Sequence, residues 1–233
     1  MDALERAAGA VVGSAVGDAL GAPFEFGPAG AFSARFPGPG AGGEMCGGGG
    51  WTRPGASPPS PTATRAAWEG TAIFHDLVRV ALDGGDSLEA IPQSLAAVPA
   101  DQRARYATVL DPRWHPDRAT EFNGAVWPCL GSAVWALRTT YGYEDAVRAA
   151  IDLGGDTDTV AAVTGGLAGA VHGLAAIPAR WTEPLHVPLP GGGGRTLRLR
   201  DLIDLARRAR WAPTGPGRAD QHAAFPNRQE HAP

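Results

Sequence analysis

Two long apolar segments carry glycine or alanine at every fourth position, and this spacing constrains the fold more than any other feature of the sequence. In residues 3–21 the small residues are Gly9, Gly13, Gly17 and Gly21; in the run after residue 159 they are Ala161, Gly165, Gly169 and Gly173. Residues four apart share one face of an α-helix, and each interior glycine costs about 1 kcal/mol relative to alanine. A face made of glycine therefore indicates that another backbone approaches closely. We expect two helices that pack against each other, or around a common core, through these faces.

The second segment begins with a dense cluster of oxygen-bearing side chains. It reads Gly154-Gly155-Asp156-Thr157-Asp158-Thr159. Carboxylate, hydroxyl and carbonyl oxygens are the ligands that Mg²⁺, Mn²⁺ and Ca²⁺ prefer, and the glycines permit a tight turn. Aspartate and threonine are equally common helix N-caps, where they accept hydrogen bonds from free backbone N–H groups. The spacing alone leaves a helix cap and a metal site open.

A further candidate site residue is Glu25, which follows the end of the first predicted helix. Pro23 ends the helical pattern and places Glu25 in the next loop. It could belong to a site at this helix end, or it could be an ordinary exposed glutamate.

Composition excludes several classes of partner. The chain has 233 residues, 44% of them hydrophobic, which suits one sizeable domain. The net charge is −4 and all basic side chains are arginines, with no concentrated basic surface for nucleic acid or an anionic membrane. No apolar run reaches the roughly twenty residues that span a bilayer, and the N-terminus lacks the basic start of a signal peptide. We expect a cytoplasmic protein.

Helical periodicity predominates along the chain. Helices are predicted for residues 3–21, 65–82, 101–110, 126–139, 143–151, 160–173 and 199–211, and a further helix is predicted to open at Ser87 with this serine as its cap. Residues 27–64 form a Gly/Pro/Ser-rich passage, and residues 212–233 lack periodicity and are expected to be disordered. Because no convincing set of strands is present, the sequence predicts an all-α domain of eight or nine helices over residues 1–211.

Two separated motifs give the chain its resemblance to a known family. The first is Gly13-x-x-x-Gly17-Asp18-Ala19-Leu20-Gly21-x-Pro23-x-Glu25, and the second runs from Asp152 to Ala162 and continues through Gly165-Gly166-Leu167-Ala168-Gly169 to Ile177-Pro178-x-x-Trp181. Together they resemble the ADP-ribosylglycohydrolase family, over roughly residues 5–51 and 65–211. The second motif is the more specific of the two.

The resemblance implies a compact orthogonal bundle of helices that hydrolyses the bond between the ribose anomeric carbon of ADP-ribose and an acceptor. The implied ligands are ADP-ribose, ADP-ribosylated proteins or small molecules, and a pair of Mg²⁺ or Mn²⁺ ions. By position, Asp156, Asp158 and Thr159 match the metal ligands, and Glu25 matches a catalytic carboxylate near the ribose. Gly154, Gly155 and Thr157 are the implied substrate-binding residues.

The chain departs from the family pattern in its central part. Family members carry a second ligand run, Thr-Asp-Asp-Thr, where this chain reads Trp51 to Pro58, and no aspartate occurs between Asp18 and Asp76. A Gly-Asn-Gly-Ser-x-Met-Arg run is also missing, because Asn123-Gly124-Ala125 does not match it. We interpret residues 53–64 as a junction across a missing central block that contained some of the helices. Metal occupancy is then expected to be weakened.

Three hypotheses follow. The first is a metal-dependent hydrolase that takes its missing ligands from Glu44, Glu69 or a partner subunit. The second is a catalytically impaired binding or regulatory module that keeps one half of the metal site. The third is a truncated product without a function of its own. The sequence does not determine the acceptor, the choice between Mg²⁺ and Mn²⁺, or the oligomeric state.

Overall fold

The computed structural model describes residues 1–38, 40, 42–45, 61–188 and 194–211. Within these residues the chain forms ten α-helices, three short 3-10 segments and one pair of two-residue strands. The helices are α1 (Ala3–Gly21), α2 (Ala31–Arg35), α3 (Pro61–Leu82), α4 (Ile91–Ala96), α5 (Ala100–Val109), α6 (Val126–Thr139), α7 (Tyr143–Ile151), α8 (Thr157–His172), α9 (Ala179–Thr182) and α10 (Leu199–Trp211). The 3-10 segments are η1 (Ala22–Phe24), η2 (Pro116–Arg118) and η3 (Leu174–Ala176), and β1 (Val187–Pro188) pairs antiparallel with β2 (Thr196–Leu197).

The predicted all-α class is confirmed. The expected count of eight or nine helices is too low because α2 and α9 have five residues or fewer, too few to show helical periodicity. The helix predicted to open at Ser87 is α4, which begins at Ile91. The Gly/Pro/Ser-rich passage over residues 27–64 also contains regular structure, because α2 and the first turn of α3 lie within it. Residues 53–60 of the expected junction at 53–64 and the expected disordered tail at 212–233 lie outside the described residues.

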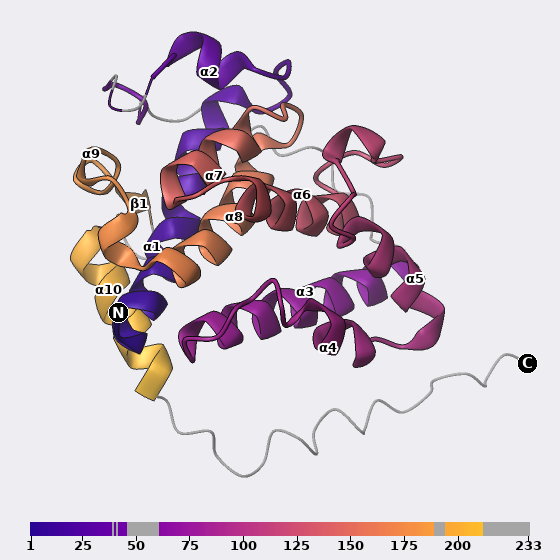
Figure 1. Cartoon of the computed structure of the whole chain (residues 1–233). Helices are drawn as coiled ribbons and strands as arrows, with labels where there is room; N and C mark the ends of the chain where they lie inside the picture. Colours follow the sequence, from indigo (N-terminus) through magenta and orange to yellow (C-terminus); the bar gives the residue numbers. More distant parts are fainter. Residues whose placement is uncertain (39, 41, 46–60, 189–193, 212–233) are drawn as a thin grey trace, which may run out of the picture.

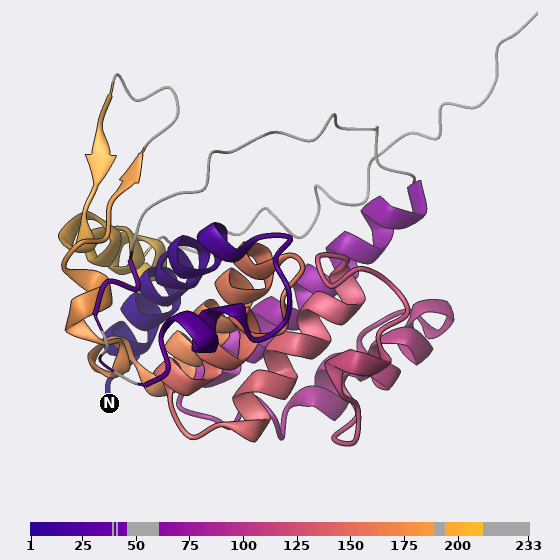
Figure 2. The same cartoon turned by 90° about the horizontal axis from the view of Figure 1, so that it is seen from above.

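Helix α8 is the centre of the bundle. It contacts α1 on one side, α6 and α7 on another, and α3 on a third (Figure 1). Helix α10 lies against α1 near the N-terminus, and the β1–β2 pair projects from the helices beside α10 (Figure 2). One main cluster of buried apolar side chains joins α1, α3, α6, α7 and α8. The boundaries of a single domain at residues 1 and 211 stay a prediction.

The two glycine stripes meet, as the sequence predicts. A Cβ atom added to Gly9 would lie 2.1 Å from the carbonyl oxygen of Gly169, and one added to Gly13 would lie 2.3 Å from that of Gly165. At Gly17 the same atom would lie 2.0 Å from the carbonyl oxygen of Ala161. From one contact to the next, the residue number in α1 increases by four and the residue number in α8 decreases by four, so the two helices are antiparallel. Their backbones touch where any side chain would clash.

At the two ends of the helix contact, Gly21 of the first stripe and Gly173 of the second do not meet a residue of the opposite stripe. Gly21 meets Thr157, whose carbonyl oxygen would lie 2.3 Å from an added Cβ, whereas Gly173 meets Met1. The Thr157 hydroxyl also donates a hydrogen bond to the carbonyl oxygen of Gly21 at 2.8 Å. The C-terminal end of α1 is therefore level with the first turn of α8. This register places the loop that carries Glu25 beside the acidic cluster.

Helix α1 also tests the expectation that no apolar segment is long enough to span a bilayer. Residues Ala3–Phe24 are long and apolar enough to cross a bilayer by length and composition alone, so the statement that no apolar run reaches this length is wrong for this segment. The reason is that its many alanines, valines and leucines offset its few charged residues. Half of the apolar window is buried, as it is in the core helices of many proteins. The cytoplasmic location and the absence of a nucleic-acid partner stay predictions.

Candidate functional site

Three carboxylates converge where α1 ends and α8 begins. One oxygen atom each from Glu25, Asp156 and Asp158 lies within 4.8 Å of the other two. The two aspartates are half-buried and Glu25 is exposed. Within the described residues, this is the one group of three or more His, Cys, Asp and Glu side chains close enough to share a metal ion.

The local sequence before α8 fixes the two aspartates. Gly154 and Gly155 have φ angles of +70° and +69°, a left-handed conformation that glycine adopts without steric cost. Asp156 is the N-cap of α8 and accepts a hydrogen bond from the backbone N–H of Thr159 at 3.3 Å, and Asp158 accepts from the same group at 2.7 Å. The helix-cap interpretation is thus confirmed, and the metal site stays a prediction, although the capping carboxylates also converge with Glu25.

Backbone hydrogen bonds join the two loops that carry the carboxylates. The N–H of Phe26 donates to the carbonyl oxygen of Gly155 at 2.6 Å, and the N–H of Gly155 donates to that of Gly27 at 3.2 Å. Further along, the backbone N–H and the hydroxyl of Ser33 both donate to the carboxylate of Asp152. The loop after α1 and the loop before α8 therefore form one unit.

Asn123 is a site residue that the sequence analysis missed. Its side-chain oxygen accepts from the backbone N–H of Asp156 at 2.9 Å, and its side-chain N–H donates to the carbonyl oxygen of Gly154 at 2.7 Å. The next residue, Gly124, has no room for a side chain, since a Cβ would lie 1.9 Å from the carboxylate of Asp156. The available signal was that Asn123 is one of two asparagines in the chain and precedes a glycine.

The electrostatics of the cluster raise the pKa of Asp158 from its ordinary value to about 6. Burial is the largest cause, followed by the hydrogen bond with Asp156 and the negative charges of Glu25 and Asp156. The hydrogen bond from the Thr159 N–H acts in the opposite direction. Three carboxylates this close hold a proton readily, and a cation would compete with that proton.

The donor set fits a hard divalent cation. Around octahedral Mg²⁺ neighbouring ligands lie about 3 Å apart and opposite ones about 4.2 Å apart, so the three oxygens, which lie within 4.8 Å of one another, would move closer together to bind one ion. Carboxylate oxygens are also the ligand type that Mg²⁺ and Mn²⁺ prefer. Glu25, Asp156 and Asp158 are the residues that would hold the ion.

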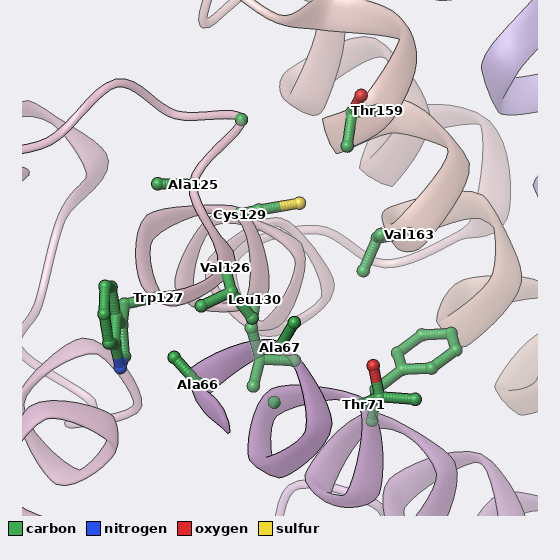
Figure 3. Close-up of a pocket in the computed structure, with 13 residues that line it drawn as sticks. Ala66, Ala67, Thr71, Ala125, Val126, Trp127, Cys129, Leu130, Thr159 and Val163 are labelled. Atoms are coloured by element: carbon green, nitrogen blue, oxygen red, sulfur yellow. The ribbon is translucent and has the colours of Figure 1, made fainter. Parts of the chain in front are cut away.

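A cavity of about 450 Å³ lies next to the cluster, between α3, α6 and α8 (Figure 3). Its lining is mostly apolar and includes Ala66, Ala67, Gly70, Thr71, Phe74, Gly124, Ala125, Val126, Trp127, Cys129, Leu130, Thr159 and Val163. Thr159 and Gly124 connect it to the aspartates. This volume is within the range of small-molecule sites. Burial, reinforced by the charge of Asp156, raises the pKa of the Cys129 thiol to about 12, so this cysteine is not a nucleophile at neutral pH.

The other predicted site residues have different surroundings. Thr159 is exposed and lines the cavity, and its expected role as a metal ligand stays a prediction. Thr157 is fully buried and its hydroxyl donates a hydrogen bond to the carbonyl oxygen of Gly21, and its expected contact with a substrate stays a prediction. Gly154 packs against residues 27–29, and Gly155 packs against Asn123. The two glycines shape the loop, and their contact with a substrate stays a prediction.

Neither glutamate proposed as a replacement ligand joins the cluster. Glu44 is 1% exposed and pairs with Arg180 at 3.2 Å, and Arg180 also pairs with Glu144. Glu69 lies in α3 near Tyr106. Burial of Tyr106, together with the negative charge of Glu69, raises the pKa of the Tyr106 hydroxyl to about 12. In the described part of the chain, the proposed supply of ligands from Glu44 or Glu69 is therefore wrong, because both side chains have other surroundings.

Comparison with known proteins gives the family. The sequence profile of the ADP-ribosylglycohydrolase family matches residues 1–63 and 59–214. The ADP-ribosylarginine hydrolase Tri1 of Serratia proteamaculans (strain 568) is 43% identical over 63 residues, which are 27% of this chain and 17% of that protein. Tri1 of Pseudomonas putida (strain GB-1) is 39% identical over 61 residues, 26% of this chain and 16% of that protein. The match thus spans about a sixth of each curated relative.

A solved structure described as an ADP-ribosylglycohydrolase-related protein complex is 25% identical, with a TM-score of 0.48, over 88% of this chain and 96% of that one. The two profile matches overlap and together cover residues 1–214, which include every residue of the carboxylate cluster. The chain belongs to the ADP-ribosylglycohydrolase family.

Proposed function

We propose that this protein hydrolyses the bond between the ribose anomeric carbon of ADP-ribose and an acceptor group, with a divalent cation as cofactor. The observation that carries the proposal is the convergence of Glu25 with Asp156 and Asp158 in a chain of this family. Because the curated relatives are named ADP-ribosylarginine hydrolases, arginine is the first acceptor to test.

The residues of the site suit this reaction. A bound divalent cation would supply Lewis acidity and lower the pKa of a coordinated water. Departure of the acceptor leaves positive oxocarbenium character on the ribose, which the negative carboxylates stabilise. Glu25 is the exposed member of the cluster, so it can also face the ribose and accept a proton from the attacking water. Asp156 and Asp158 are held by the turn and by Thr159, and the apolar cavity takes up part of the substrate and keeps water out.

A specific observation favours a second candidate, a module that binds ADP-ribose or a cation with little turnover. The described residues provide one group of three carboxylates, and Glu44 is held by Arg180. Octahedral Mg²⁺ needs about six oxygen ligands. Water or a ligand must supply the remainder, which weakens binding of the ion.

Calorimetry and a turnover assay separate the two candidates. The full chain is titrated with Mg²⁺, Mn²⁺ and ADP-ribose, and release of ADP-ribose is measured from peptides modified on arginine or serine. Asp158→Ala removes a cluster carboxylate, and Glu89→Ala is the matched control because Glu89 is exposed in the turn before α4. Metal-dependent turnover that is lost only in Asp158→Ala supports the hydrolase. Binding without turnover supports the module, and absence of both overturns the two proposals.

A further inference from the structure

Two exposed phenylalanines, each next in sequence to a residue of the site, stack on each other. The ring centroids of Phe26 and Phe122 are 6.1 Å apart and the ring planes differ by 20°. Phe26 is 65% exposed and Phe122 is 53% exposed. Exposed pairs of large apolar side chains often mark a binding surface.

Both rings are attached to the backbone that positions the cluster. Phe26 follows Glu25, and its N–H donates to the carbonyl oxygen of Gly155. Phe122 precedes Asn123, which bonds to Gly154 and Asp156. Since neighbouring Cα atoms are about 3.8 Å apart, each ring starts one residue from a group that forms or supports the site.

The backbone of Phe26 is strained, and the core does not require its ring. With a φ of +60°, Phe26 is the one non-glycine residue with positive φ among those described. This conformation costs roughly 1–2 kcal/mol for an L-residue. Two positions earlier, Phe24 is buried and packs edge-on against Phe32 and Phe36. The strained conformation thus holds an apolar ring at the surface next to the site, where burial does not repay its cost.

The chemistry around the pair favours a planar cation. The face of an aromatic ring attracts positive charge, and a guanidinium also stacks on it through its flat surface. The neighbouring carboxylates of Glu25, Asp156 and Asp158 attract the same positive charge. A neutral planar group would gain the stacking alone.

We propose that Phe26 and Phe122 form the acceptor subsite of this protein and bind the guanidinium of ADP-ribosylated arginine. This inference rests on the proposed hydrolase or ADP-ribose-binding function. The acceptor is bonded directly to the anomeric carbon, so it must lie beside the reacting carboxylates, and Phe26 directly follows Glu25 while Phe122 directly precedes Asn123, which bonds to Asp156. The adenine lies at the opposite end of ADP-ribose.

The test compares three probes on the full chain with Mg²⁺ present: free ADP-ribose, and one peptide sequence ADP-ribosylated on either arginine or serine. Binding is measured by calorimetry, and KM and kcat are determined separately wherever turnover occurs. Phe26→Leu and Phe122→Leu remove one ring each and keep an apolar side chain, whereas Phe122→Tyr keeps the ring. Tyr141→Leu is the control, because Tyr141 is 98% exposed and belongs to the loop between α6 and α7.

Each leucine variant should bind the arginine peptide about three- to tenfold more weakly and change the other two probes less than twofold. Phe122→Tyr and Tyr141→Leu should behave as the wild type. An equal loss for all three probes, or no loss, overturns the subsite while the proposed function stands. If the wild type binds none of the probes, the subsite and the proposed function fail together.

Discussion

The side-chain oxygen of Asn123 accepts a hydrogen bond at 2.9 Å from the backbone N–H of Asp156, a residue 33 positions later in the chain. The same side chain donates to the carbonyl oxygen of Gly154, so it spans the turn that carries the first aspartate of the cluster. The position of Asp156 relative to Glu25 therefore depends on the segment before α6 as well as on the start of α8.

Asn123→Ala should weaken binding of Mg²⁺ or Mn²⁺ about tenfold, because groups that orient metal ligands typically contribute tenfold or more to affinity. Calorimetric titration measures this effect. The variant also leaves two backbone groups without their partner and should lose about 1–3 kcal/mol of unfolding free energy. Thr139→Ala is a matched control, since its hydroxyl bonds to the Trp135 carbonyl at the far end of α6. Unchanged metal affinity in Asn123→Ala would show that the amide does not position the cluster.

Gly13→Ala should destabilise the fold because the new methyl group would lie 2.3 Å from the Gly165 carbonyl oxygen and 2.9 Å from the Tyr143 ring. Overpacking at a rigid backbone contact costs about 3 kcal/mol, and the gain of about 1 kcal/mol in helix propensity offsets only part of it. Gly142→Ala is the control, since nothing lies within 4 Å of its added Cβ. Urea denaturation of both variants checks the difference, and equal stabilities would contradict the close contact of α1 with α8.

Asp158 should make both metal binding and stability depend on pH. Its folded pKa of about 6 exceeds the ordinary value of 3.8, so the folded state binds more protons than the unfolded state between these values. The stability contributed by the protonated group is fully present below about pH 4 and is lost as pH rises through 6. Over the same range the apparent affinity for Mg²⁺ should rise, because the ion displaces the proton.

The comparison of wild type with Asp158→Asn isolates this group from the other carboxylates. Denaturation at pH 4, 5, 6 and 7 should show the variant gaining stability relative to the metal-free wild type as pH increases. A constant difference across these pH values would mean that Asp158 has an ordinary pKa.

Cys129 should resist alkylation in the folded protein, because burial and the nearby Asp156 raise the pKa of its thiol to about 12. Treatment with iodoacetamide at pH 7.5, followed by mass spectrometry of the Cys129 peptide, should show almost no modification within an hour. The same treatment in 8 M urea serves as the control and should give full modification. Rapid labelling of the native chain would indicate that the cavity wall opens.

The sequence alone was sufficient for the features that depend on local spacing. Glycines at every fourth position predict the contact of α1 with α8, because steric exclusion of side chains acts through helical geometry. The Gly-Gly-Asp-Thr-Asp-Thr run likewise predicts a tight turn that caps α8, since these residues bond to backbone groups within three positions.

Tertiary structure alone decided which distant side chains share the site. The antiparallel register brings Gly21 to Thr157, 136 residues away, and so brings Glu25 to Asp156 and Asp158. The orientation of α8 about its own axis buries Thr157 and leaves Thr159 exposed, although both are threonines of one motif. Asn123 and Glu44 acquire their partners only through packing. Local propensity carries no information about which residues meet across the bundle, because that choice is made by the packing of whole helices.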